Sequence, residues 1–147
     1  LRLTFGVSTF VPKAHTPFQW YGVRAESKKH LKQLAKKLQP QGINLRPESF
    51  GWSLIQALLA RSDRRIAPII EAVRGSQNSL GKWKQAYNQA YDNKNDRYNL
   101  GPLPSWEEVI HQNWDSKRIL PWTHLQGPVK EEILIKHQLQ SFHPNDC

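Results

Sequence analysis

The sequence predicts an α/β unit over residues 1–48, followed by a mainly helical segment over residues 49–147. Two apolar stretches near the start, "LRLTFGVSTF" and "INLRP", read as strands and flank an amphipathic stretch with helical spacing. After residue 48 the apolar residues recur only at helical spacing. With 147 residues and 38% hydrophobic content, the chain suits one modest core, either a whole domain or a piece of one.

The expected strand–loop–helix–strand order rests on local patterns. Apolar and smaller residues alternate from Leu1 to Val7, which predicts the first strand. In "AESKKHLKQLAKKLQPQG", apolar residues recur on one helical face and lysines occupy the others, so a helix is expected that ends at Pro40 and Gly42. "INLRP" ends at Pro47, which is typical of a short strand at a sheet edge.

The second segment carries signals for helix starts. Ser49 and Ser79 stand where N-caps are expected, and Ser105 with Glu108 has the spacing of a capping box. Pro68 indicates a helix that either begins near it or is kinked there. The expected helices lie in "GWSLIQALLA", "SDRRIAPIIEAVRG", "SLGKWKQAYNQAY", "SWEEVIHQNW" and "VKEEILIKHQLQSF".

The net charge of +9 is concentrated in the first two thirds of the chain. Residues 1–50 carry nine Lys and Arg against two acids, residues 51–100 eight against four, and residues 101–147 four against six. This basic balance suits an anionic partner such as RNA or a phosphate-bearing cofactor, and it equally suits solvated helix faces. The sequence has no run of about 18 apolar residues, so no membrane span is predicted.

The residues at the two ends of the sequence predict that the chain is a fragment of a cytoplasmic protein. It opens with neither Met nor a signal-peptide pattern, and a strand is already under way at Leu1. Its single cysteine, Cys147, excludes an internal disulfide and favours a reducing compartment. The six histidines show no paired metal-ligand spacing, so no metal site made wholly within the chain is expected, although Cys147 could belong to a group that continues beyond it.

A cluster of arginines forms one candidate site. "RSDRR" places Arg61, Arg64 and Arg65 around Asp63 within about one helical turn. Arginine favours planar, bidentate partners such as carboxylates and phosphates, so the cluster could hold an acidic neighbour or the anionic part of a substrate while Asp63 caps a helix. The alternative is an exposed helix start whose charges pair locally.

The opening loop, residues 8–22, forms the second candidate site. Pro12 and Pro17 each fix one backbone angle, and a stiff loop after a parallel strand is where α/β enzymes present groups to ligands. His15 offers a donor and an acceptor near neutral pH, Thr16 a hydroxyl, and Trp20 a flat surface for stacking. The alternative is that the aromatic residues plug the domain edge and His15 satisfies a backbone group.

Four segments of the chain, in order, resemble radical S-adenosylmethionine enzymes. "STFVPKAHTPFQW" is similar to the proline-rich loop late in their barrel, and "RSDRRIAPIIEAV", "SWEEVIHQNW" and "LPWTHLQGPVKEEIL" resemble members of the uncharacterised cobalamin-binding-type group. The resemblance implies the C-terminal strands and helices of a partial (β/α) TIM-like barrel, followed by a helical extension. Ala14 departs from the family pattern, which usually has proline there.

The same resemblance implies an iron–sulfur enzyme of which this chain is one part. Family members hold a [4Fe-4S] cluster through a Cys-x3-Cys-x2-Cys motif and cleave S-adenosylmethionine, with cobalamin as a further cofactor to consider. That motif is absent from the chain, so the chain alone is expected to bind no cofactor and to be inactive. Its expected role is to wall the substrate side of the barrel within the rest of the parent polypeptide. The implied binding residues are Ser8, Pro12, His15, Thr16, Pro17, Trp20, Arg61, Asp63, Arg64 and Arg65.

Two other functions remain open from the sequence. The first is a basic helical RNA-binding module without catalysis, which would use the lysine face of residues 28–37 for phosphates and exposed aromatic residues for base stacking. The second is a structural lid, which requires the aromatic residues of the opening loop to be buried.

Overall fold

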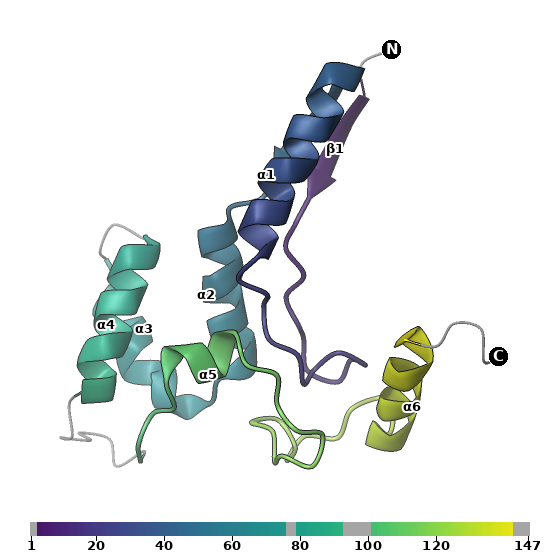
Figure 1. The fold of residues 1–147 in the computed structure, drawn as a ribbon. Coiled ribbons are helices and arrows are strands. Elements are labelled where there is room, and N and C mark those ends of the chain that lie inside the picture. The colour runs from purple at the N-terminus through teal and green to yellow at the C-terminus, as the bar shows by residue number, and fades with distance from the viewer. Residues whose placement is uncertain (1–2, 76–78, 93–100, 143–147) are drawn as a thin grey trace.

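The computed structural model describes residues 3–75, 79–92 and 101–142 of the chain. These residues form a mixed α/β structure that is mostly helical, with two parallel strands and six α-helices (Figure 1). No helix within the described residues combines the length and the apolar character needed to cross a membrane. The expected α/β unit followed by helices is therefore confirmed at this level.

The α/β unit is a single strand–helix–strand motif. Strand β1 (Leu3–Val7) pairs in parallel with β2 (Ile43–Pro47), and helix α1 (Ser27–Leu38) lies between them in sequence. A short 3₁₀ turn, η1 (Gln39–Gln41), follows α1, and Gly42 adopts a positive φ of 73° to end it. Both expected strands and the expected helix are confirmed.

The barrel implied by the family resemblance is not seen in the described residues. Their sheet has two strands, whereas closing a barrel requires further strands on both sides. Parallel sheets are normally covered on both faces, yet Leu3 and Phe5 of β1 are 44% and 48% exposed and α1 has no buried residue. The unit thus carries apolar surface that the described part of the chain leaves uncovered.

The helical segment begins with α2 (Phe50–Arg61), 3₁₀ turn η2 (Arg64–Ile66) and α3 (Ala67–Val73), and continues with α4 (Leu80–Asp92) and α5 (Trp106–Ile110). Pro68 lies in the first turn of α3, so the helix begins there and is not kinked. The buried residues of this core are Val23, Leu54, Ile55, Ala57, Leu58, Ile66, Ile69, Val73, Trp83, Ala86, Tyr87, Val109 and Ile110.

The predicted caps are realised in part. Ser49 occupies the N-cap of α2 without a capping bond from its side chain, whereas Ser79 Oγ accepts from the backbone of Lys82. Ser105 Oγ accepts from the Glu108 backbone N–H at 3.1 Å, as a capping box requires. The Glu108 carboxylate bonds to Arg118 at 2.8 Å, away from the cap, because a charged partner lies within reach.

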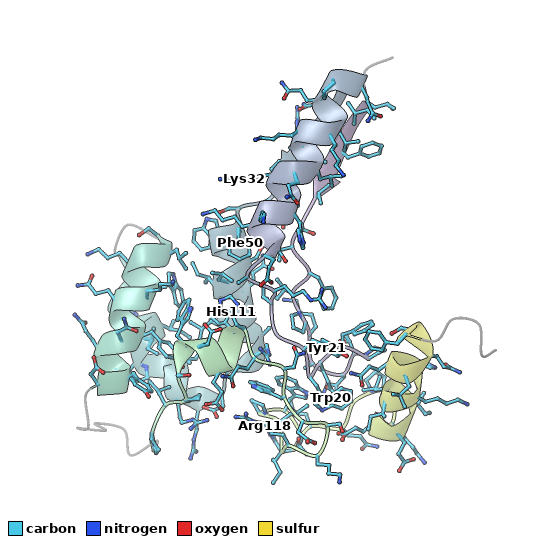
Figure 2. The ribbon with its side chains drawn as sticks, in the orientation of Figure 1. Trp20, Tyr21, Lys32, Phe50, His111 and Arg118 are labelled. Atoms are coloured by element: carbon cyan, nitrogen blue, oxygen red, sulfur yellow. The ribbon has the colours of Figure 1, made fainter. Side chains whose placement is uncertain are left out.

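A second, smaller core lies between the opening loop and the last helix, α6 (Glu131–Phe142). It consists of Trp20, Trp114, Leu120, Trp122 and Leu134, with the rings of Trp114 and Trp122 6.4 Å apart. Phe18 and Tyr21 of the loop contact Phe142 of α6. Figure 2 shows Trp20 and Tyr21 where the loop comes down toward α6.

The opening loop is fixed to the segment that follows α5. The Val23 N–H donates to the Ile110 carbonyl at 2.8 Å, and the Trp114 N–H donates to the Trp20 carbonyl at 2.7 Å. Between these bonds the two backbones approach so closely that a Cβ on Gly22 would overlap the His111 carbonyl. The loop therefore joins the two cores, since Val23 belongs to the first and Trp20 to the second.

Candidate functional site

The opening loop turns sharply at His15. This residue has a positive φ of 56°, which places a side chain other than glycine in the left-handed region. The turn is closed by the His15 N–H, which donates to Gln19 Oε1 at 2.9 Å, and by Thr16 Oγ1, which donates to the Lys13 carbonyl at 2.7 Å. The Thr16 hydroxyl proton is therefore used within the loop, while the imidazole of His15 makes no hydrogen bond with a described residue.

Gln19 organises this loop, and sequence reasoning did not single it out. Its side chain is buried, at 2% exposure, and its Oε1 accepts from both the His15 backbone and Trp122 Nε1, the latter at 2.8 Å. A buried polar group needs such partners, and here they connect residues 103 positions apart. The available signal was a lone amide between aromatic residues in "PFQWYG".

The His15 side chain lines a pocket of about 190 Å³ beside the start of α6. Gly127 faces the imidazole so closely that a Cβ there would lie 2.5 Å from His15 Nδ1. The imidazole offers one hydrogen-bond donor and one acceptor in its neutral form, so the pocket can bind a small polar group. The other polar residues that line it are Gln19, Thr123, Gln126, Lys130 and Glu131.

The remaining loop residues of the predicted site lie apart from this pocket. Ser8 is exposed and lines a separate groove of about 440 Å³ beside α1. Pro12 is fully buried and Pro17 is half-buried. The expectation that Trp20 offers a stacking surface is wrong, because the indole is 2% exposed and packs in the second core.

The buried side chain of Arg61 binds backbone carbonyls, which the sequence did not indicate. Its side chain is 1% exposed and donates to three backbone carbonyls, those of Val109 at 2.6 Å, Ile110 at 3.1 Å and Gln112 at 2.8 Å. These carbonyls lie at and just after the end of α5, where helix carbonyls lack partners. Arg61 thus closes the end of a helix from 48 residues away.

The positive charge of Arg61 is buried away from water, which makes the charged form of the side chain less favourable. Its guanidinium carbon lies 3.9 Å from the ring centre of Trp114, which provides a cation–π contact. Burial, with a smaller contribution from the positive charge of Arg118, lowers the pKa of Arg61 to about 10.

The neighbouring charges in "RSDRR" pair locally. Asp63 caps η2 by accepting from the Arg65 backbone N–H at 2.9 Å, as the sequence predicted, and forms an ion pair with Arg65 Nη2 at 2.8 Å. Hydrogen bonds from Arg65 lower the pKa of Asp63, and the same carboxylate raises the pKa of Arg65. Arg64 is exposed and does not line the cavity beside them.

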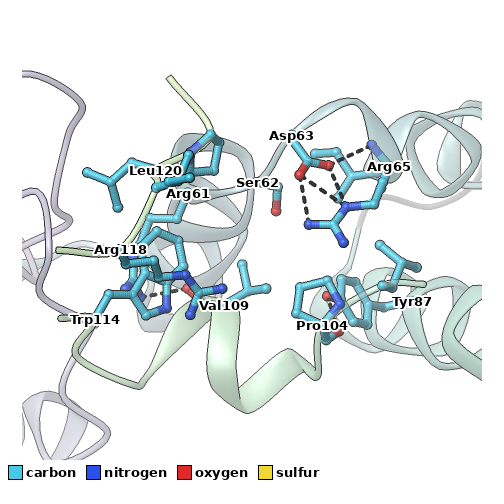
Figure 3. Close-up of a pocket in the computed structure, with 14 residues that line it drawn as sticks. Arg61, Ser62, Asp63, Arg65, Tyr87, Pro104, Val109, Trp114, Arg118 and Leu120 are labelled. Carbon is cyan, nitrogen blue, oxygen red and sulfur yellow. Dashed lines mark hydrogen bonds and ion pairs between the residues drawn. The ribbon is translucent and has the colours of Figure 1, made fainter. Parts of the chain in front are cut away.

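Around these residues lies a cavity of about 210 Å³ (Figure 3). It lies between η2 and the segment at residues 114–121, and its charged lining residues are Arg61, Asp63, Arg65 and Arg118. Arg118, which sequence reasoning missed, is bonded to Glu108 and lies 4.6 Å from the ring centre of Trp114. Its position in an irregular link gave no periodic signal that would have placed it here.

Tyr87 lines the same cavity and is expected to make stability fall at alkaline pH. Burial raises its pKa to about 12, and its hydroxyl donates to the Pro104 carbonyl at 2.8 Å. An unfolded tyrosine ionises near pH 10, so between about pH 10 and 12 the unfolded state binds fewer protons than the folded state. The free energy of unfolding therefore falls by about 2 to 3 kcal/mol over this range.

Urea unfolding at pH 9 and at pH 11.5 measures this effect in the native chain, in Tyr87→Phe and in Tyr91→Phe. Tyr91 lies on the same helix and is 52% exposed, so its replacement should leave the alkaline loss in place. Tyr87→Phe should lose most of the pH dependence. Equal alkaline losses in the two variants would contradict the assignment to Tyr87.

The described residues contain no group of three His, Cys, Asp or Glu side chains that could hold a metal ion. Cys147, the residue named as a possible ligand, lies outside the described residues. An iron–sulfur cluster therefore finds no ligand set in the described part of the chain.

The chain is distantly similar to a protein of known sequence. No family model matches the chain, and no solved structure matches it. The chain is 30% identical over 84 residues to an uncharacterised protein of Methanocaldococcus jannaschii. The matched stretch is 57% of this chain and spans only 19% of that protein.

Proposed function

We propose that this chain is part of a radical S-adenosylmethionine enzyme, in which the loop from Ser8 to Trp20 walls the substrate side of a partial (β/α) barrel. The loop follows the carboxyl end of β1, a strand in a parallel pair, which is where α/β folds place their ligands. The uncovered apolar side chains on β1 suit a unit that packs against further strands and helices of a parent polypeptide.

The packing together of the four family-like segments carries this proposal. Gln19 of the first segment bonds to Trp122 of the fourth, and Arg61 of the second bonds to the Val109 carbonyl of the third. The Trp114 N–H of the third segment donates to the Trp20 carbonyl of the first, so these bonds join all four segments into one structural unit. This supports the resemblance more strongly than four separate matches along the chain.

In this proposal the chain contributes binding and enclosure, and the cluster ligands come from elsewhere in the parent. The [4Fe-4S] cluster would supply the electron that cleaves S-adenosylmethionine, with cobalamin as a second candidate cofactor. From this chain, the His15 imidazole would hydrogen-bond the substrate or cofactor. The left-handed backbone at His15 supports this role, because strained conformations of this kind cluster at functional sites.

The test replaces His15 with Ala in the complete polypeptide and follows formation of 5′-deoxyadenosine and of product. We expect a loss of about tenfold, the effect of losing one hydrogen bond that contributes about 1 to 1.5 kcal/mol. The control is His137→Ala, an exposed histidine on α6 away from the pocket. Unchanged cleavage and product formation in His15→Ala would remove His15 from the site.

Gly127→Ala gives an independent probe of the same contact. The added methyl group must displace the whole His15 side chain, because it would lie 2.5 Å from Nδ1, 2.8 Å from Cγ and 3.2 Å from Cβ. We therefore expect Gly127→Ala to lower product formation, with a fall in the unfolding midpoint that measures the cost of this shift. A full loss of folding would instead indicate that the ring cannot move.

A basic RNA-binding module is the second candidate, and one feature of α1 favours it. Lys28, Lys32 and Lys36 recur at intervals of four, all exposed, on a helix without acidic residues. Like charges at this spacing repel one another, and an RNA backbone would relieve the repulsion. Figure 2 labels Lys32 beside α1.

Salt dependence of RNA binding separates this candidate from the first. Changing the three lysines to Gln should reduce the dependence of binding on salt by about two to three charges if they contact phosphates. The matched control changes Lys82, Lys117 and Lys136, which are also exposed, to Gln. Equal effects of the two sets would mean that net charge alone attracts RNA.

A further inference from the structure

We propose that the cavity between η2 and residues 114–121 binds a small oxyanion, the carboxylate or phosphate group of a ligand. This site is separate from the His15 pocket and does not depend on the family to which the chain belongs. Three arginines and one carboxylate line the cavity, so its charged lining carries an excess of positive charge. Arginine is the side chain best suited to planar, bidentate contacts with oxyanions.

Two buried polar groups on this cavity have no partner among the described residues. They are Ser62 Oγ and Arg61 Nε, both on residues that line it. Buried polar groups in native proteins almost always have a partner, so two such donors on one cavity point to a polar ligand or ordered water there. Figure 3 shows the Ser62 hydroxyl in the space between the Arg118 side and the Arg65 side.

The donors left over after internal pairing are mostly those of Arg118. Arg65 directs Nε and Nη2 at Asp63 and Nη1 at the Pro102 carbonyl. The Arg118 guanidinium gives a single bond, from Nη2 to Glu108, and its other N–H groups have no bond within the described residues. The bond to Glu108 and the contact with Trp114 hold its guanidinium in place before a ligand arrives.

The size and walls of the cavity restrict the ligand. At about 210 Å³ it is smaller than the roughly 300 to 1,000 Å³ of sites that enclose a whole cofactor. It has room for an anionic group with a short apolar attachment. Ile119 on the wall is 84% exposed. The buried or half-buried apolar residues of the wall reduce contact with water, which strengthens charged contacts, and they are Ile66, Leu103, Pro104, Val109, Leu120 and Pro121.

The test titrates the 147-residue chain with inorganic phosphate and, in a second arm, with acetate. Binding is followed by tryptophan fluorescence, because Trp114 lines the cavity, and by calorimetry. Sodium chloride at equal ionic strength serves as the reference. We expect saturable binding of at least one of the two oxyanions, and the arm that binds identifies phosphate or carboxylate as the group.

Variants locate the binding. Arg118→Gln should weaken it by about tenfold, the loss expected for one charged hydrogen-bonding partner. Ser62→Ala should weaken it several-fold. Lys117→Gln removes the same charge from the next position without reaching the cavity lining, so binding should change less than twofold. No saturable binding in either arm, or equal losses in Arg118→Gln and Lys117→Gln, would overturn the proposal.

Discussion

Replacing Arg61 with Met is expected to lower the free energy of unfolding by about 3 to 5 kcal/mol. The variant leaves the buried Val109 carbonyl and the partly buried Gln112 carbonyl without the Arg61 donor, whereas the Ile110 carbonyl keeps its bond from the Val23 N–H. Removing a poorly solvated charge offsets part of this loss, since burial of Arg61 already lowers its pKa. The unsatisfied carbonyls should dominate, because each costs about 1 to 3 kcal/mol.

The measurement is urea unfolding followed by tryptophan fluorescence, with Arg64→Met as the matched control. Arg64 is exposed and lies in the neighbouring turn η2, so its replacement should change the free energy of unfolding by less than about 0.5 kcal/mol. Arg61→Lys should recover only part of the loss, because a single ammonium cannot serve carbonyls spread over four residues. If Arg61→Met were as stable as Arg64→Met, the carbonyl contacts would carry no net stability.

Trp20→Ala is expected to destabilise the chain by about 3 to 5 kcal/mol, the range for removing a large buried aromatic side chain. Trp20 is 2% exposed and contributes to the second core, which holds the loop and α6 together. The loss should be greatest in the packing of α6, so limited proteolysis near residues 131–142 should increase. Trp20→Phe should be milder, since the indole N–H has no partner among the described residues.

Phe10→Ala is the control for this prediction. Phe10 belongs to the same loop and is 59% exposed, so its removal should cost well under 1 kcal/mol. A comparably small effect of Trp20→Ala would mean that the indole is accessible after all. Trp20 would then regain its predicted role as a stacking surface.

The local elements of this fold could be predicted because they depend on neighbouring residues. The lysine-flanked apolar stripe of α1, the end of the turn η1 at Gly42 and the start of α3 near Pro68 all follow from short-range rules. The Ser105 cap follows from the same rules. The barrel could not be tested in this way, because closure depends on strands that the described residues do not include.

The candidate sites were harder to predict because their contacts are distant in sequence. A helical repeat places Arg61 at the end of α2, yet nothing in it indicates carbonyls 48 to 51 residues away. Gln19 and Arg118 were missed for the same reason, since their partners come from other segments. His15 was singled out as a binding residue from its place between two prolines, and its left-handed backbone carries no sequence signal of its own.

The most direct test of the proposed function is anaerobic purification of the complete parent polypeptide, followed by iron analysis and an assay for reductive cleavage of S-adenosylmethionine. The proposal predicts about four irons per polypeptide in a [4Fe-4S] cluster, and 5′-deoxyadenosine that appears only with a reductant. It also predicts that His15→Ala keeps the cluster and loses product formation. A complete polypeptide that binds no iron and leaves S-adenosylmethionine intact would contradict it.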